Sequence, residues 1–120
     1  MPGVRTVIYK DKEILVIDYN GCATDAEMLK VLYEARETIL RENKPYLQLT
    51  ILENAYVSFS YMNELKRIAK EMPKLAIKRA IVGVNSNARK VLLKGYNMIF
   101  GGNGMHPFDT EIEAKEWLVK

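Results

Sequence analysis

Two short, mainly apolar stretches near the N-terminus have the composition typical of β-strands. Residues 4–9 and 13–19 are rich in Val, Ile, Leu and Tyr, which favour extended backbone. Asp11 and Lys12 lie between them and predict a turn. The chain is therefore expected to open with a β-hairpin.

A capping box predicts the first helix. In Thr24-Asp25-Ala26-Glu27, the threonine oxygen can accept from a free backbone N–H, and a glutamate follows three residues later. The helix is expected to end at Asn43-Lys44-Pro45, because proline cannot continue it. Apolar residues at helical spacing predict its buried face. They are Met28, Leu29, Leu32, Ala35, Ile39 and Leu40.

Two further strand and helix pairs follow. Residues 46–52 are expected to form a strand, and the nearly all-apolar residues 79–84 are typical of one buried on both faces. The helix between them is expected to close at Pro73. A third helix is expected to be capped within residues 85–87 and broken at Gly101-Gly102-Asn103-Gly104. The predicted buried stripes are Met62, Leu65, Ile68, Ala69 and Met72 in the second helix, and Ala88, Val91, Leu92, Gly95 and Ile99 in the third.

The chain is expected to end with a short strand and a helix. Residues 105–108 could form the strand, and Asp109 or Thr110 is expected to cap a helix that buries Ile112, Ala114, Trp117 and Leu118. The order ββαβαβαβα predicts one α/β domain over residues 1–120, with a mixed, mainly parallel sheet. Residues 46–52 and 79–84 should then be parallel neighbours inside the sheet.

Composition narrows the class of protein. The chain has 120 residues, of which 48% are hydrophobic and 28% charged, as in ordinary globular domains. No apolar run approaches the ~20 residues of a membrane span. The first residues lack the pattern of a secretion signal. The lone cysteine, Cys22, fits a reducing compartment, so a cytoplasmic location is expected.

Positive charge is concentrated in residues 66–94. The net charge is only +3, but residues 66–94 contain nine Lys or Arg and one acidic residue, a balance of +8. Six of these bases are expected on the outer faces of the second and third helices. They are Lys66, Arg67, Lys70, Arg89, Lys90 and Lys94. They predict either two solvated helix faces or a surface for an anion or an acidic partner; no nucleic-acid motif is visible.

Sequence signatures of enzymes are mostly absent. Neither the G-x-x-x-x-G-K-[ST] nor the G-x-G-x-x-G phosphate motif occurs, and one Cys with one His cannot supply the usual zinc ligands. Residues 101–104 are expected to be a flexible loop, with a ligand clamp as the alternative. A Cys22/His106 pair is conceivable, since a helix start can lower a thiol pKa, but nothing in the sequence places the two together. We predict no catalytic residue, cofactor or metal.

The segment between the third strand and the second helix is the strongest candidate for a contact site. Ligands of open α/β sheets gather beyond the carboxyl ends of strands, and aromatic residues are favoured at interfaces. The candidate binding residues are Asn54, Tyr56, Ser58, Ser60 and Tyr61. Ser58 or Ser60 should cap the helix, and either is also a plausible phosphate acceptor.

Several motifs stand in an order that resembles a known family. They are Asp18-Tyr19-Asn20-Gly21, Ala80-Ile81-Val82-Gly83-Val84, Val91-Leu92-Leu93, and Pro107-Phe108-Asp109-Thr110 followed by Ala114 and Trp117-Leu118. Together they resemble the SpoIIAA-like group of the STAS superfamily over nearly the whole chain. The resemblance implies a mixed sheet of four or five strands with helices. It also implies binding to a partner protein, switched in anti-sigma-factor antagonists by phosphorylation of a serine near Ser58 to Ser60.

The chain departs from the antagonist pattern at that serine. Ser58 stands where the antagonists have an aspartate, Phe59 replaces a serine, and no glycine follows Ser60. We predict a non-catalytic protein-interaction or regulatory domain, and a homodimer stays open. The alternative is a carrier of a small apolar or anionic ligand, which would need a cavity of ~300 Å³. Its lining could include Met62, Met72, Met98, Tyr56, Phe59 and Phe100.

Overall fold

The computed structural model describes residues 2–100 and 104–120, without the side chains at positions 92, 99 and 100. The elements follow the order ββαβαβαβα, as the sequence predicts. They are β1 (Gly3–Tyr9), β2 (Lys12–Asp18), α1 (Asp25–Glu42), β3 (Tyr46–Ile51), α2 (Phe59–Glu71), β4 (Ala76–Val82), α3 (Asn87–Phe100), β5 (His106–Phe108) and α4 (Glu111–Leu118).

The strands form one mixed sheet in the order β1-β2-β3-β4-β5. β1 pairs antiparallel with β2, and each later pair is parallel. β3 and β4 lie inside the sheet, where Thr50 pairs with Ile81. The prediction of an α/β fold with a mainly parallel sheet is therefore confirmed. The prediction that these two strands are interior parallel neighbours is also confirmed, but β4 spans Ala76–Val82 and not the predicted residues 79–84.

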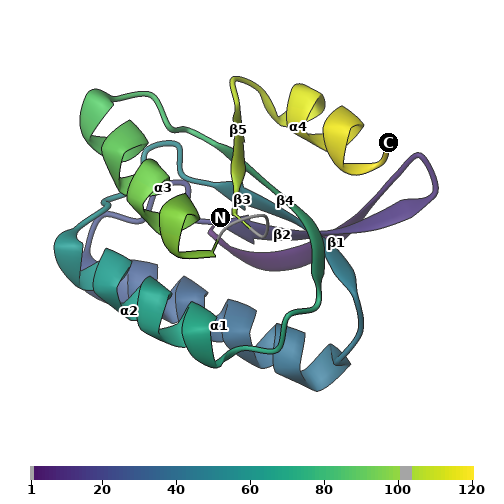
Figure 1. The fold of residues 1–120 in the computed structure, drawn as a ribbon, viewed down its shortest axis with the longest axis horizontal. Coiled ribbons are helices and arrows are strands. Elements are labelled where there is room, and N and C mark those ends of the chain that lie inside the picture. Colours follow the sequence, from purple (N-terminus) through teal and green to yellow (C-terminus); the bar gives the residue numbers. More distant parts are fainter. Residues whose placement is uncertain (1, 101–103) are drawn as a thin grey trace.

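The helices α1, α2 and α3 cover one face of the sheet, and α4 covers the other (Figure 1). The crossovers through α1, α2 and α3 each lead to the next strand in the same direction across the sheet. Because such crossovers share one hand, their helices fall on the same face. α4 follows the edge strand β5 and packs back over β4 and β3.

Each central strand sends alternate side chains into two separate cores. Leu47, Leu49 and Ile51 of β3 pack in the core beneath α4. Gln48 and Thr50 lie on the opposite face, toward α1 and α2, and are buried there although they are polar. A polar row therefore lies inside the core that the three helices cover.

The hairpin turn falls one residue earlier than the sequence suggests. Tyr9 pairs with Lys12, so the loop consists of Lys10 and Asp11. Both loop residues have positive φ, 50° and 67°, as a two-residue turn matched to the twist of the strands requires. The predicted turn at Asp11 and Lys12 is wrong because Lys12 already belongs to β2.

The predicted helix ends agree with the structure. The Oγ1 of Thr24 accepts a hydrogen bond from the N–H of Glu27 at 3.2 Å, and Asn43, whose φ is 47°, is the C-cap of α1. Thr110, rather than Asp109, caps α4. In the described part of the chain, no helix is long and apolar enough to cross a membrane.

Several predicted helix interiors are wrong. Leu40, Ala88, Val91 and Ile112 are all exposed. In α3 the buried side chains are Leu93 and Tyr96. Apolar residues stand side by side at positions 91–93, so periodicity alone allowed more than one face to be buried. The predicted glycine break at positions 101–103, and the side chains of Leu92 and Ile99, lie outside the described residues.

Candidate functional site

The loop between β3 and α2 is bonded to the loop between β2 and α1. The N–H of Tyr56 donates to the carbonyl of Cys22 at 2.9 Å, and the N–H of Gly21 donates to the carbonyl of Asn54 at 3.3 Å. The Asn54 side chain also donates to Asn20 Oδ1 at 3.1 Å. The candidate residue Asn54 therefore lies where two loops join beyond the carboxyl ends of β2 and β3.

Ser58 caps α2 and connects it to α1. Its Oγ accepts a hydrogen bond from the N–H of Tyr61 at 3.1 Å, and its hydroxyl donates to the carboxylate of Asp25. Ser60 lies exposed in the first turn. The predicted cap is therefore confirmed at Ser58. A phosphate on Ser58 would face the Asp25 carboxylate, and the two negative groups would repel each other.

The two candidate tyrosines differ in exposure. Tyr56 is 51% exposed, but Tyr61 is only 2% exposed. The Tyr61 ring meets the Tyr19 ring edge-on, with 5.3 Å between centroids, and burial raises the pKa of Tyr61 well above its usual value. The prediction that Tyr61 lies on a contact surface is wrong, because this ring pair holds it in the core. Its neighbour Phe59 is 80% exposed instead.

An open cleft of about 450 Å³ lies beyond the carboxyl ends of β3, β4 and β5. Its lining residues come from the segments that follow these strands and from the start of α3. They are Glu53, Asn54, Gly83, Val84, Asn85, Lys90, Phe108 and Asp109. The cleft thus brings together Asn54 and Lys90, which the sequence assigned to two different candidate sites. Its polar lining suits the polar groups of a partner better than an apolar ligand.

Arg89 points inward from the first turn of α3. Its guanidinium donates to the carbonyl oxygens of Leu52 at 2.9 Å, Gly83 at 2.8 Å and Ala55 at 2.5 Å. Ser86 caps the same turn by accepting from the N–H of Arg89 at 3.2 Å. The prediction that Arg89 lies on the outer face of the helix is therefore wrong. Its charged guanidinium binds carbonyl oxygens of the segments that follow β3 and β4.

The charge of Arg67 is balanced on its own helix. Its Nε lies 2.6 Å from Glu64 Oε1, and its Nη1 lies 3.4 Å from Glu71. The hydroxyl of Tyr33 also donates to Glu64. The bonds from Arg67 and Tyr33 lower the pKa of Glu64 to about 2. The six predicted basic residues therefore do not contribute equally to a positive surface.

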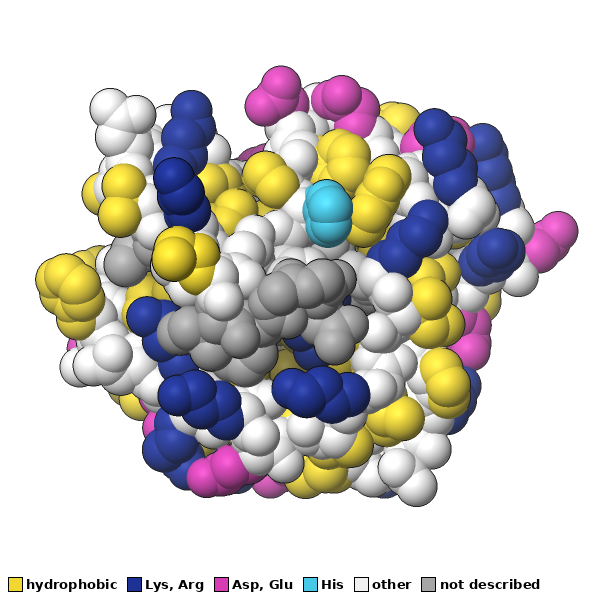
Figure 2. Space-filling view, in the orientation of Figure 1, with side chains coloured by type: hydrophobic (Ala, Val, Ile, Leu, Met, Phe, Trp, Pro, Cys, Tyr) yellow, Lys and Arg dark blue, Asp and Glu magenta, His cyan; other side chains and the backbone are white. Residues whose placement is uncertain are grey.

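Exposed apolar side chains gather around the β3–α2 loop and on α3. Val91 and Met98 are 69% and 79% exposed, and Lys94 lies between them at helical spacing, so the three share one face of α3. Figure 2 shows apolar and basic side chains interspersed over α3 and an apolar projection at the start of α2. We define the α2–α3 surface as Tyr56, Phe59, Lys90, Val91, Lys94 and Met98.

Residues of the β3–α2 loop, α2 and α3 line a small apolar hollow of about 30 Å³ above the sheet. Val57 and Met62 line it from the α2 side, and Arg89 and Leu93 line it from α3. The part of the α2–α3 surface near the start of α2 and the part on α3 therefore belong to elements that line the same hollow.

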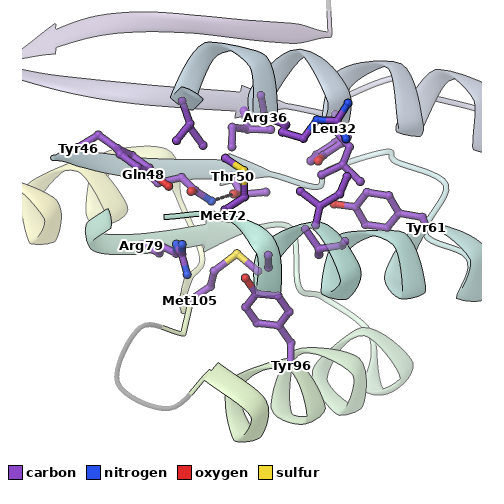
Figure 3. A pocket seen from close by; sticks show the side chains of 17 residues that line it. Leu32, Arg36, Tyr46, Gln48, Thr50, Tyr61, Met72, Arg79, Tyr96 and Met105 are labelled. Atoms are coloured by element: carbon purple, nitrogen blue, oxygen red, sulfur yellow. Dashed lines mark hydrogen bonds between the residues drawn. The ribbon is translucent and has the colours of Figure 1, made fainter. Parts of the chain in front are cut away.

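A second hollow of about 60 Å³ lies between the sheet, α1, α2 and Tyr96 of α3 (Figure 3). Its helical walls are mainly apolar, but three polar side chains of the sheet face it: Gln48, Thr50 and Arg79. Gln48 Nε2 donates to Thr50 Oγ1 at 2.9 Å. Gln48 and Arg79 stand opposite each other in the register of β3 and β4. This hollow joins an apolar wall to a polar floor.

The residues proposed for a carrier cavity divide between these hollows and the surface. Met62 and Met72 line the hollows, as predicted. Tyr56, Phe59 and Met98 are exposed, so their assignment to a cavity is wrong. The side chain of Phe100 lies outside the described residues.

The conceivable Cys22/His106 pair does not form. Cys22 is buried in the core beneath α1 and α2, where burial raises the pKa of its thiol. The His106 ring packs 4.6 Å from the Trp117 ring, which belongs to the core beneath α4. The two residues therefore lie on opposite faces of the sheet. Among the described residues, no cluster of three or more His, Cys, Asp or Glu could hold a metal ion.

Two features of the site escaped sequence reasoning. The first is the contact of Arg89 with three carbonyl groups, which no local pattern signals. The second is the polar floor, for which a signal exists: Gln48 and Thr50 interrupt an otherwise apolar strand at every second position. This alternation indicates that one face of β3 differs chemically from the other.

Comparisons of the chain with protein-family models, with curated proteins and with solved structures find no match. Membership of the SpoIIAA-like group therefore stays a prediction from the order of sequence motifs. What the site can do is argued below from its geometry and charges.

Proposed function

We propose that this chain is a non-catalytic protein-interaction or regulatory domain whose partner binds the α2–α3 surface. The observation that carries this proposal is the exposure of Phe59 on α2 and of Val91 and Met98 on α3, at 69% to 80%. Lys90 and Lys94 are exposed on the same helix as Val91 and Met98. Large apolar side chains grouped on a surface mark contact sites, because water leaves them when a partner covers them. Aromatic residues and Met are enriched at such interfaces.

The charges define the chemistry of the partner. Lys90 and Lys94 favour acidic groups around an apolar contact, so the proposed partner segment is both acidic and apolar.

The resemblance to STAS domains supports the same class of function, since anti-sigma-factor antagonists act by binding partner proteins. Regulation at Ser58 would act through its contact with Asp25. The buried lone cysteine, Cys22, is compatible with action in the cytoplasm.

The proposal is tested by capture with matched variants. The immobilised chain is used to capture partners from a lysate of the source organism, alongside the V91S/M98S double variant and the I112S variant. Ile112 is exposed on α4, across the sheet from the α2–α3 surface, so I112S controls for the loss of surface apolarity. A specific partner should be retained by I112S and lost by V91S/M98S. Equal retention by all three proteins would refute the α2–α3 surface as the contact site.

Charge gives an independent test on the same partner. Because exposed charges are screened over ~8 Å at physiological ionic strength, association should slow as salt is added. K90E/K94E should slow association further and leave thermal stability nearly unchanged. K30E on α1 changes the charge of an exposed lysine elsewhere and should have little effect. Association that does not depend on salt would show that these lysines do not attract the partner and only contact water.

A further inference from the structure

We propose that the free edge of β1 pairs antiparallel with β1 of a second copy of this chain, which gives a two-fold symmetric dimer with one continuous sheet. β1 and β5 are the edge strands of the sheet. β5 has three residues and contains Pro107, which has no N–H to donate, so it is a poor partner for another strand. β1 has seven residues, no proline and an unbroken register with β2. β1 is therefore the edge better suited to extend the sheet.

The hairpin turn decides which backbone groups of β1 face away from the sheet. Tyr9 and Lys12 flank a two-residue loop, so they form a hydrogen-bonded pair, and such pairs alternate along an antiparallel ladder. Odd-numbered residues of β1 therefore bond to β2. Val4, Thr6 and Ile8 direct their N–H and C=O groups outward.

One of these outward groups is covered and the next two are open. The N–H of Val4 donates to Glu34 Oε1 of α1 at 2.6 Å, which agrees with its outward direction. Within residues 2–100 and 104–120, no loop or side chain accepts from the N–H of Thr6 or Ile8, and both residues are exposed. Figure 1 shows the turn end of the hairpin projecting from the body of the molecule, so another strand has access to this edge.

The open groups select the register of the dimer. When Thr6 lies opposite Ile8 of the second copy, each such pair exchanges both of its backbone hydrogen bonds, and Val7 lies opposite Val7 of the second copy. A shift in one direction would need the N–H of Val4, which already bonds to α1. A shift in the other direction would need Lys10, which belongs to the turn. The register centred on Val7 therefore satisfies the open groups without breaking a bond.

Side chains on the α1 face of β1 favour a second copy as the occupant. Ile8 is 66% exposed. In this register the two Ile8 side chains are diagonal neighbours within reach of each other, and each lies beside Thr6 of the other copy. Thr6 lines a hollow of about 50 Å³ whose lining includes Leu15 and Ile39. The apolar side chain that this edge exposes would thus be covered by its own counterpart and by the rim of this hollow.

Charges near the edge do not drive this pairing. On the α4 face, Arg5 would lie opposite Tyr9 of the second copy. Arg5 already bridges Asp18 at 3.0 Å, and the Tyr9 hydroxyl donates to Glu116 at 2.7 Å. Two lysines also lie near the Tyr9 ring, Lys10 and Lys115. Added salt should therefore not weaken the dimer, unlike association at the α2–α3 surface.

The proposal is tested by sedimentation velocity on the wild-type chain. A contact between two strand edges is smaller than the ~1,600 Å² of a standard interface, so we expect a dissociation constant between about 1 μM and 1 mM. The sedimentation coefficient should rise with protein concentration over this interval. A monomer at every concentration up to about 1 mM would overturn the proposal.

Matched variants test the edge itself. T6P removes an outward N–H, which an edge strand tolerates, and should weaken the dimer about tenfold or more, whereas T6V keeps the N–H and should dimerise as the wild type does. I8K places two like charges at diagonal positions and should also weaken it, whereas I112K alters an isoleucine of equal exposure on α4 and should not. If T6P does not fold, I8K and I112K decide. Equal dimerisation of either matched pair would overturn the proposal.

A disulfide tests the register. V7C should form a linked dimer with oxidised glutathione, because opposite residues of a non-hydrogen-bonded pair have Cα atoms about 4.5 Å apart, within disulfide range. The wild type, whose Cys22 is buried, and I112C control for unspecific oxidation. Linkage of V7C no faster than that of I112C would contradict the register. V91S/M98S should dimerise as the wild type does, so failure here is distinguishable from failure of the proposed partner surface.

Discussion

The guanidinium of Arg89 lies 2.9 Å from the carbonyl oxygen of Leu52, the residue that follows β3. The same group reaches Gly83, which follows β4, so one side chain of α3 joins the ends of two central strands. This contact also sets the rotation of α3. With Arg89 inward, Leu93 and Tyr96 follow on the same face, and Val91 and Met98 are left exposed.

We expect R89M to lower the free energy of unfolding by about 2–4 kcal/mol. One hydrogen bond from a charged donor contributes about 1.5–3 kcal/mol, and the contributions of one side chain to three partners are not additive, so the expected loss lies below their sum. R89K should restore little, because one ammonium group cannot replace a guanidinium that reaches three separate carbonyls. Urea unfolding measures the change. K90M, on the exposed neighbour, should remain within about 0.5 kcal/mol of the wild type.

We expect G83A to be far more destabilising than G21A. Both glycines have positive φ, 93° and 87°, so both substitutions strain the backbone. A Cβ at Gly83 would also lie 2.5 Å from the backbone nitrogen of Glu53, whereas a Cβ at Gly21 would meet nothing within 4 Å. G21A should cost about 1–2 kcal/mol, and G83A about 2 kcal/mol more. Similar unfolding midpoints for the two variants would contradict this close approach of β4 to the β3–α2 loop.

S58A and S60A, which alter the two serines at the start of α2, should differ in their effect on stability. S58A should cost about 1 kcal/mol or somewhat more, because it removes both the cap of α2 and the hydrogen bond to Asp25. S60A should change little, since Ser60 is exposed within the first turn. Thermal unfolding of the two variants and the wild type measures this difference in stability. A larger loss for S60A would show that the cap had been assigned to the wrong serine.

Acid should destabilise the chain partly through Glu64. Its pKa falls from the ordinary 4.5 to about 2 in the folded chain, first because Arg67 and then because Tyr33 donates to it. A lowered folded-state pKa stabilises the fold above the unfolded value, and this contribution is lost as pH falls from about 4.5 toward 2. E64Q should therefore flatten the dependence of Tm on pH over that interval.

The carboxyl resonance of Glu64 gives a direct measurement of the same effect. Its NMR titration midpoint should lie near 2 in the wild type. Y33F removes one donor and leaves Arg67 in place, so the midpoint should rise part of the way toward 4.5. An unchanged midpoint in Y33F would show that the Tyr33 hydroxyl does not act on this carboxyl group.

The sequence by itself determined the order of the elements and the caps of most helices, although the hairpin turn and the bounds of β4, Ala76–Val82 rather than 79–84, differ from the prediction. Thr24, Ser58, Thr110 and Pro45 act on residues at most a few positions away, so their signals can be followed along the chain. The order of strands and helices then restricted the sheet to a mainly parallel arrangement, because crossovers have one hand. The candidate loop followed from the same reasoning, and Ser58 and Asn54 do lie where strand ends meet a helix start.

Only the tertiary structure decided which way α3 faces and what lines the core. Three consecutive apolar residues at 91–93 made its buried face ambiguous, and the choice came from Arg89 meeting carbonyl groups far away in the sequence. Tyr61 is buried because it meets Tyr19, a residue of a separate loop. The hollow above Gln48 and Arg79 exists because two strands and three helices converge there. Such contacts depend on how distant segments pack against one another, and no local pattern of residue types specifies them.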